Sequence, residues 1–185
     1  MSKEGRSSEG SRRLFFALWP SEAQQQAIEH RLKERVGASG GRAIPARNLH
    51  VTLIFLGNVP DSQFEITKAC AAQATGEIAF DLTFDRLETW SRSRVLCLAA
   101  SAVPQVLAQL VERLQFNLLR QGFEIRQEEF RPHVTLARDV KKRGIQEAIP
   151  AFQWQVEHFV LVESQRGPAG SQYTIAARWP MRRAG

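Results

Sequence analysis

The tetrapeptide His-Val-Thr-Leu occurs twice in this chain, at residues 50–53 and 133–136. Each copy closes the same series of segments: an apolar strand, a helical segment and then the strand that carries the tetrapeptide. The first series covers residues 14–56 and the second covers residues 94–138. Two copies are too few for a solenoid. The duplication therefore predicts two pseudosymmetric lobes, each of which presents one histidine to a shared cleft.

Apolar periodicity, with the glycines and prolines that interrupt it, predicts the order of the elements. Ser21 followed by Gln24 resembles a capping box at the start of the first helix. A turn through residues 167–170 is expected to join the last two strands. Strands mixed with helices indicate an α+β fold whose sheets are covered by helices. We expect helices at residues 21–36, 60–74 and 104–121, and strands at residues 14–19, 48–56, 80–84, 94–100, 133–137, 153–163 and 172–179.

The chain reads as one domain behind a short tail. Residues 1–12 are polar and charged, which predicts a disordered tail and not a secretory signal. Residues 13–185 have a length typical of one compact domain, here with two lobes. No apolar run approaches the roughly 20 residues that span a bilayer, so we expect no membrane association.

Charge and cysteine content favour a class of partner and a compartment. The net charge is +6 with a pI of about 10.0, which favours a polyanionic partner such as nucleic acid but also serves solubility. Cys70 and Cys97 are too few and too far apart for a disulfide framework or a zinc site. Each is expected to pack as a small apolar residue in a reducing compartment, which favours the cytoplasm.

Both tetrapeptides place a histidine and a threonine on one face of a strand. Side chains alternate faces along a strand, so residues two apart point the same way. His50 therefore shares a face with Thr52, and His133 shares a face with Thr135. The valine and leucine of each tetrapeptide point to the opposite face, where they can anchor the strand in the core.

Two histidines can cleave a phosphodiester without a metal ion. A neutral imidazole takes a proton from the attacking water, and an imidazolium gives a proton to the leaving oxygen. Each such transfer typically contributes about 10²–10⁴-fold to the rate. Threonine hydroxyls can donate hydrogen bonds to phosphoryl oxygens, and arginine can add charge-assisted contacts. His50 and His133 are thus the predicted catalytic pair, and Arg131 and Arg138, which flank the second tetrapeptide, are candidates for phosphate binding.

Other catalytic schemes lack the residues that they require. Two histidines without a third ligand make a poor zinc site, so we expect no metal and no cofactor. The glycine-rich nucleotide-binding loops and a serine or cysteine nucleophile elbow are absent from the sequence. His30 and His158 lie outside the tetrapeptides, and we expect them to be structural or surface residues.

These motifs resemble the paired His-x-Thr/Ser-x motifs of the two-histidine (2H) phosphoesterase superfamily. Within it, the chain is most similar to the RNA 2′,3′-cyclic phosphodiesterase family, also called 2′-5′ RNA ligase. The resemblance covers nearly the whole chain after residue 12. Its supporting segments lie at residues 13–20, 48–57, 131–138, 161–164 and 170–180.

The resemblance implies a bilobal fold in which two mainly antiparallel sheets line a central cleft, with helices outside. It also implies hydrolysis of a terminal 2′,3′-cyclic phosphate to a 2′-phosphate. By this resemblance, His50 protonates the leaving 3′-oxygen and His133 activates water. The sequence itself does not distinguish these two roles, because the two halves are nearly symmetric.

The same resemblance implies the substrate contacts. Thr52 and Thr135 bind the phosphate together with Arg138. Phe16 and Tyr173 are candidates for contacting the terminal nucleoside.

Three functions stay open at this point. The first is an RNA-end phosphodiesterase that acts as a monomer in the cytoplasm, with 2′-5′ ligation as a reverse reaction. The second is a cyclic phosphodiesterase for a small nucleotide or an ADP-ribose derivative, and the basic charge favours RNA over these. The third is a non-catalytic RNA-binding module, which would not need two intact proton-transfer groups.

Overall fold

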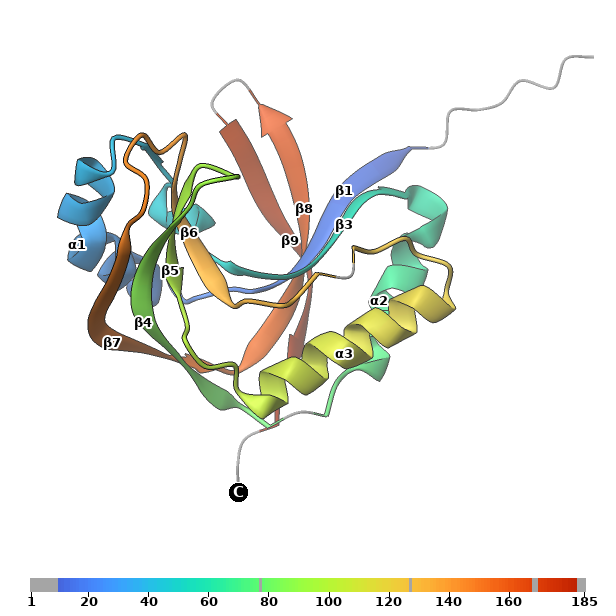
Figure 1. The fold of residues 1–185 in the computed structure, drawn as a ribbon. Helices are drawn as coiled ribbons and strands as arrows, with labels where there is room; N and C mark the ends of the chain where they lie inside the picture. Colours follow the sequence, from blue (N-terminus) through green and yellow to red (C-terminus); the bar gives the residue numbers. More distant parts are fainter. Residues whose placement is uncertain (1–9, 77, 127, 168–169, 183–185) are drawn as a thin grey trace, which may run out of the picture.

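The computed structural model of this chain describes residues 10–76, 78–126, 128–167 and 170–182. Antiparallel β-structure occupies the middle of the molecule, and α-helices lie on its outside (Figure 1). The predicted α+β class with helices outside is confirmed. Residues 1–9 of the predicted tail lie outside the described residues, and the first strand already includes Ser11 and Arg12.

The longer strands form two antiparallel groups, and each group contains the tetrapeptide strand of one predicted lobe. A short strand, β2 (Arg42–Ala43), pairs with β6 of the second group. The first group contains β3 (Val51–Pro60), β1 (Ser11–Leu18), β8 (His158–Gly167) and β9 (Gly170–Pro180). The second group contains β6 (His133–Arg138), β5 (Val95–Ala99), β4 (Phe80–Trp90) and β7 (Gln146–Val156).

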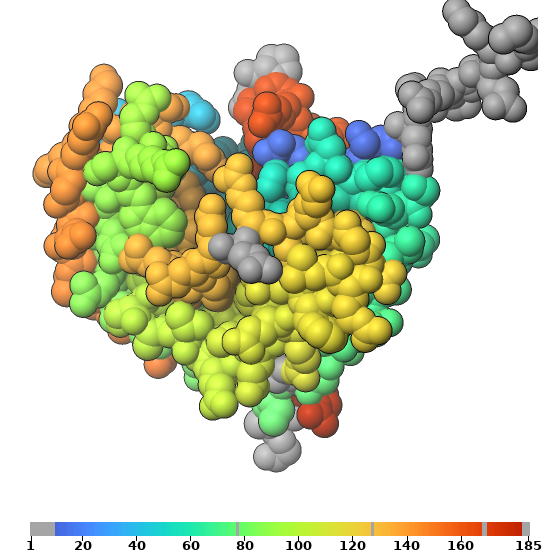
Figure 2. All heavy atoms as spheres, turned by 45° about the vertical axis from the view of Figure 1, so that its right-hand side comes forward, coloured from blue at the N-terminus to red at the C-terminus, as the bar shows by residue number. Residues whose placement is uncertain are grey.

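The two groups meet where β3 pairs with β6. Val51 lies opposite Val134 in an antiparallel pair, and the strand order runs β7-β4-β5-β6-β3-β1-β8-β9. The two sheets that the family resemblance implies are therefore joined into one sheet at this point. In Figure 2, the green and orange segments of the second group and the blue and cyan segments of the first lie on opposite sides of a hollow.

The duplication predicted from the tetrapeptides is present in the fold. One copy runs β1, α1 (Glu22–Ala38), β3, and the other runs β5, α3 (Gln105–Arg120), β6. In each copy the lead strand pairs antiparallel with the strand that carries the tetrapeptide. The remaining helix, α2 (Phe64–Gln73), packs beside α3. None of the helices in the described ranges is long and apolar enough to cross a membrane.

Helix α1 supports the segment that leads into the first histidine. The predicted capping box is present, since Ser21 Oγ accepts from the Gln24 amide and Gln24 Oε1 accepts from the Ser21 amide. Buried Gln25 donates a hydrogen bond to the carbonyl oxygen of Leu49 at 3.3 Å. The residue before His50 is therefore tied to a capped helix.

The single strand predicted at residues 153–163 is wrong. β7 ends at Val156 and β8 begins at His158, and only Glu157 separates them. β7 pairs with β4 in the second group, whereas β8 pairs with β1 in the first. No glycine or proline marks this passage between the groups, so the apolar pattern alone predicted one continuous strand. The predicted turn at 167–170 lies partly outside the described residues, but Gly167 pairs with Gly170 across it.

Candidate active site

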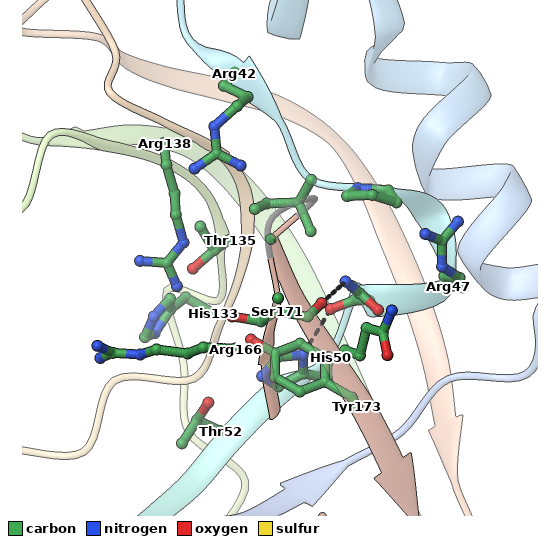
Figure 3. Close-up of a pocket in the computed structure, with 16 residues that line it drawn as sticks. Arg42, Arg47, His50, Thr52, His133, Thr135, Arg138, Arg166, Ser171 and Tyr173 are labelled. Atoms are coloured by element: carbon green, nitrogen blue, oxygen red, sulfur yellow. Dashed lines mark hydrogen bonds between the residues drawn. The ribbon is translucent and has the colours of Figure 1, made fainter. Parts of the chain in front are cut away.

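A cavity of about 330 Å³ lies between the two strand groups (Figure 3). His50, directly before β3, and Thr52 in β3 line it, as do His133 and Thr135 from β6. Arg138 at the end of β6 lines the same cavity. The structure thus brings both predicted histidines, both threonines and one of the two predicted arginines to a single site.

The valine pair that joins β3 to β6 sets the relative positions of the two motifs. Both valines are fully buried. In an antiparallel pair, directly opposite side chains lie on the same face. Continuing this register places Thr135 across from His50, and Thr52 across from His133. Each histidine therefore lies beside the threonine of the other half, on the face opposite the core.

A β-bulge in each motif strand changes the alternation after the threonine. The register of β3 with β1 shifts at Leu53, and the register of β6 with β5 shifts at Leu136. An extra residue of this kind re-aims the side chains that follow it. Each leucine and the residue after it are buried. The third residue after each threonine then returns to the cleft face, and these residues are Phe55 and Arg138.

A backbone carbonyl holds each imidazole in one tautomer. His50 Nδ1 lies 2.7 Å from the Asn48 carbonyl oxygen, and His133 Nδ1 lies 2.7 Å from the Arg131 carbonyl oxygen. A carbonyl oxygen can only accept, so Nδ1 carries the proton in both rings. Nε2 is therefore the nitrogen that can take up or release a proton in each half.

Burial favours the neutral form of both histidines. Burial lowers the pKa of His50 to about 4, and the nearby His133 and Arg138 lower it further against the hydrogen bond to Asn48. Burial also lowers the pKa of His133, although the neighbouring Glu88 opposes this shift. A bound phosphate would favour the charged imidazolium and so raise both pKa values.

A tryptophan packs against the imidazole ring of each candidate catalytic histidine. The Trp19 and His50 rings stack with centroids 5.2 Å apart and an interplanar angle of 6°. The Trp90 and His133 rings lie 4.2 Å apart at 54°. Neither tryptophan was predicted, because each comes from a different segment than the histidine it contacts. The tryptophans limit the rotation of the imidazoles and contribute to their burial.

The proposed nucleoside contact at Phe16 is wrong. Phe16 is fully buried, and its ring packs 6.4 Å from that of Phe159 in the core. Strand alternation places the adjacent Phe15 on the other face, with its ring 5.0 Å from His50 and 5.3 Å from Tyr173. Tyr173 lines the cavity and stays a candidate for nucleoside contact.

Arg131 forms an ion pair with the buried carboxylate of Glu88. Its Nη2 lies 2.9 Å from Glu88 Oε2, and Trp90 Nε1 donates to the same oxygen at 3.1 Å. Arg131 lines a different part of the cleft from the cavity with Arg138, beside His133. Glu88 therefore anchors both the ring that packs on His133 and the residue whose carbonyl holds it. Glu88 could not be predicted from the motif, because it lies on β4 and the motif lies on β6.

Three further arginines line the cavity without having been singled out from the sequence. They come from β2, from the short 3₁₀ helix at Ala46–Asn48 and from the end of β8. Asn48 Nδ2 donates to the Ser171 carbonyl oxygen at 3.1 Å, which ties the 3₁₀ helix to β9. The described residues that line the cavity include no aspartate or glutamate. The added arginines are Arg42, Arg47 and Arg166.

Cys97 lies next to the site, because its thiol interacts with the Thr135 side chain, whereas Cys70 packs in the core. Both cysteines are buried, as predicted, and burial raises the pKa of Cys97 to about 12. His158 Nε2 lies 2.9 Å from Arg178 Nη1, between β8 and β9. Within the described ranges, no group of three or more histidine, cysteine, aspartate or glutamate side chains could hold a metal ion.

The duplicated fold and the paired His-Val-Thr-Leu strands around one cavity define a two-histidine phosphoesterase. The sequence model of the 2′-5′ RNA ligase superfamily matches residues 19–168. This chain belongs to that superfamily.

Curated relatives and a solved structure agree with this membership. RNA 2′,3′-cyclic phosphodiesterase from Escherichia coli (strain K12) is 34% identical over 172 residues, which cover 91% of this chain and 96% of the relative. The protein of the same name from Thermus thermophilus is 27% identical, covering 92% and 90%. The crystal structure of E. coli LigT complexed with 3′-AMP matches with a TM-score of 0.83 at 31% identity, covering 93% of this chain and 99% of LigT.

The tautomers and pKa values can be checked by ¹⁵N NMR of the histidine rings. We expect Nδ1–H tautomers for His50 and His133 at pH 7, and protonation of His50 only near pH 4. The folded pKa of His50 lies below the unfolded value of 6.5. The unfolded chain therefore binds the proton first, and stability is lost as pH falls from 6.5 toward 4. An Nε2–H tautomer, or a His50 midpoint at or above 6.5, would contradict this description.

Proposed function

We propose that this protein hydrolyses the 2′,3′-cyclic phosphate at an RNA end to a 2′-phosphate, with His50 and His133 as acid and base. The observation that carries this proposal is the pairing of two imidazoles around one arginine-lined cavity, each held through Nδ1 so that Nε2 is the nitrogen that exchanges a proton. The E. coli and Thermus relatives are named RNA 2′,3′-cyclic phosphodiesterase, which supports the same reaction. The cytoplasmic location and the monomeric state stay predictions.

The reaction needs two proton transfers on opposite sides of the phosphorus atom. His133 Nε2 takes a proton from water as the water oxygen bonds to phosphorus. The bond from phosphorus to the 3′-oxygen breaks, its electron pair stays on that oxygen, and His50 Nε2 supplies the proton that makes the 3′-hydroxyl. The products are a 2′-phosphate and a 3′-hydroxyl. The two imidazoles supply both transfers, so the proposal requires no metal ion.

The phosphoryl oxygens carry negative charge throughout this reaction. Thr52 and Thr135 can donate hydroxyl hydrogen bonds to them, one from each strand. Arg138, aimed into the cavity by the bulge in β6, adds a charge-assisted donor. Fixed donors of this kind stabilise the transition state because they need not reorganise during the reaction.

The surroundings of the two histidines favour different roles. Burial lowers the pKa of His133, but its two charged neighbours oppose each other, since Arg131 lowers this pKa and the carboxylate of Glu88 raises it. Burial lowers the pKa of His50 to about 4, and the positive charge of Arg138 acts in the same direction with no carboxylate among the described residues to oppose it, so this ring is the stronger acid once protonated. This difference supports His50 as the proton donor to the 3′-oxygen and His133 as the base. With a 5′-hydroxyl in place of water, the same transfers would form a 2′-5′ linkage.

The reaction is tested with a short RNA that ends in a 2′,3′-cyclic phosphate, in the presence of EDTA. We expect the unaltered protein to convert it to a 2′-phosphate end. His50→Ala and His133→Ala should each lose about 10²–10⁴-fold in kcat/KM, because each removes one proton transfer. His30→Ala on the outside of α1 is the matched control. Loss of conversion in EDTA, or near-normal turnover by either cleft variant, would count against the proposal.

The two roles are separated by a substrate with sulfur in place of the bridging 3′-oxygen. A thiolate leaves without being protonated, so the general acid becomes dispensable. We expect the deficit of His50→Ala to shrink to less than about tenfold on this substrate, while His133→Ala stays impaired on both. If the sulfur substrate instead restored the activity of His133→Ala, then His133 would be the general acid and His50 the base.

A further inference from the structure

A second groove runs out of the catalytic cavity over β1 and β3. It has a volume of about 410 Å³, and it shares His50, Thr52 and Arg138 with the cavity. Away from the histidines it is lined by Arg13 and Phe55. Any ligand that fills the cavity and extends past the first strand group would enter this groove.

The charge of this groove differs from that of the other exit from the cleft. The described residues that line the groove include arginines but no aspartate or glutamate. The other opening, beside His133, shares Thr52 and Phe55 with the groove but is also lined by Glu124, Glu128 and Glu129 as well as two arginines. A chain of phosphates is therefore attracted to the groove over β1 and β3 and repelled by the glutamates beside His133.

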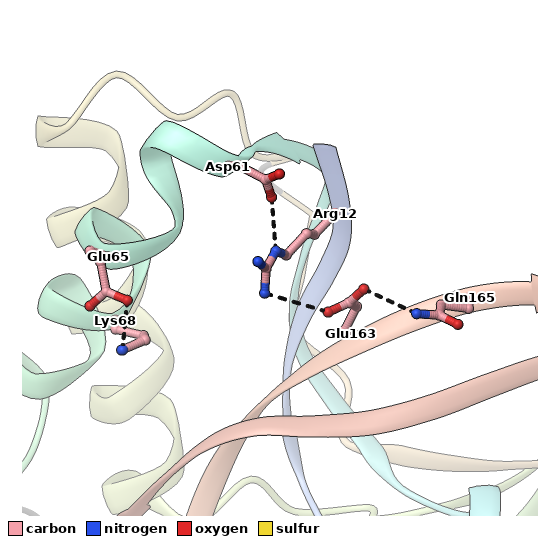
Figure 4. A network of polar contacts seen from close by, with 6 residues as sticks. All are labelled: Arg12, Asp61, Glu65, Lys68, Glu163 and Gln165. Carbon is pink, nitrogen blue, oxygen red and sulfur yellow. Dashed lines mark hydrogen bonds and ion pairs between the residues drawn. The ribbon is translucent and has the colours of Figure 1, made fainter. Parts of the chain in front are cut away.

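Arg13 is held in the groove without a carboxylate partner. Its neighbour Arg12 forms ion pairs with Asp61 at 2.8 Å and Glu163 at 3.8 Å (Figure 4). No carboxylate within the described ranges pairs with Arg13, and its guanidinium lies 4.6 Å over the ring of Phe55. The ring orients this guanidinium while its charge stays available for an anion.

Phe55 is exposed because of the bulge in its strand. Without the extra residue at Leu53, alternation from Thr52 would bring Ile54 and not Phe55 to the cleft face. Phe55 instead lies on that face with 47% of its surface exposed. It occupies the position in the first half that Arg138 occupies in the second. An exposed aromatic ring beside an arginine is the combination on which single-stranded nucleic acid bases stack.

We infer that this groove binds the nucleotide on the 5′ side of the terminal, cyclic-phosphate nucleotide. Arg13 and Arg166 pair with the phosphate that links the last two nucleotides, and Phe55 contacts the base of the second. The inference rests on the proposed function and deepens it, because it assigns residues of this chain to the second nucleotide of the RNA.

The test compares a nucleoside 2′,3′-cyclic phosphate with a dinucleotide that ends in the same group. We expect the unaltered protein to have a kcat/KM about tenfold higher for the dinucleotide. Arg13→Ala and Phe55→Ala should bring this ratio toward one. The matched controls are Arg120→Ala and Phe116→Ala, which alter a similar exposed pair on α3, 5.6 Å apart. The controls should keep the full ratio.

Salt adds an independent readout of the same contact. The dinucleotide advantage should fall as salt rises, and it should fall less steeply in Arg13→Ala, which lacks one phosphate contact. The subsite would be overturned if the unaltered protein turned over both substrates with equal kcat/KM. It would also be overturned if Arg13→Ala and Phe55→Ala both kept the full preference for the dinucleotide. Either result would leave the proposed function standing. No turnover of either substrate by the unaltered protein would instead overturn the proposed function and the subsite with it.

Discussion

The pairing of Val51 with Val134 is the contact on which the site depends. It joins the two strand groups into one sheet and fixes the register of the two motif strands against each other. Because the pair is antiparallel, each histidine is placed beside the threonine of the other half. A shift of one residue between the two strands would put the two histidines on opposite faces, with one of them turned toward the core. One backbone register thus converts two separate tetrapeptides into a single set of proton-transfer and phosphate-binding groups.

The two halves hold their histidines in the same way, but different residues surround each histidine. Each histidine donates through Nδ1 to a carbonyl two residues earlier, and each packs against a tryptophan. Each motif strand carries a bulge after the threonine. The bulge presents Arg138 in one half and Phe55 in the other, and Glu88 lies near only one of the histidines. Symmetric placement with asymmetric surroundings suits an acid and a base that must differ in pKa.

Sequence reasoning could predict what depends on short-range spacing. The shared face of His50 and Thr52, and of His133 and Thr135, follows from strand alternation alone. Contacts made through distant pairing could not be predicted, which is why Trp19, Trp90 and Glu88 were missed. The choice of Phe16 over Phe15 failed because nothing local in an apolar run shows which face meets the core. The two β-bulges could not be predicted either, because a residue is extra only in comparison with the strand that pairs with it.

The central claim is that two histidines from two halves act as one catalytic unit. The most direct measurement is kcat/KM on an RNA 2′,3′-cyclic phosphate for His50→Ala, His133→Ala and the double variant. A concerted pair predicts that the double variant loses little more than the more impaired single variant, because either deletion already breaks the unit. Losses that multiply in the double variant would contradict this account, since they would mean that the two histidines act independently.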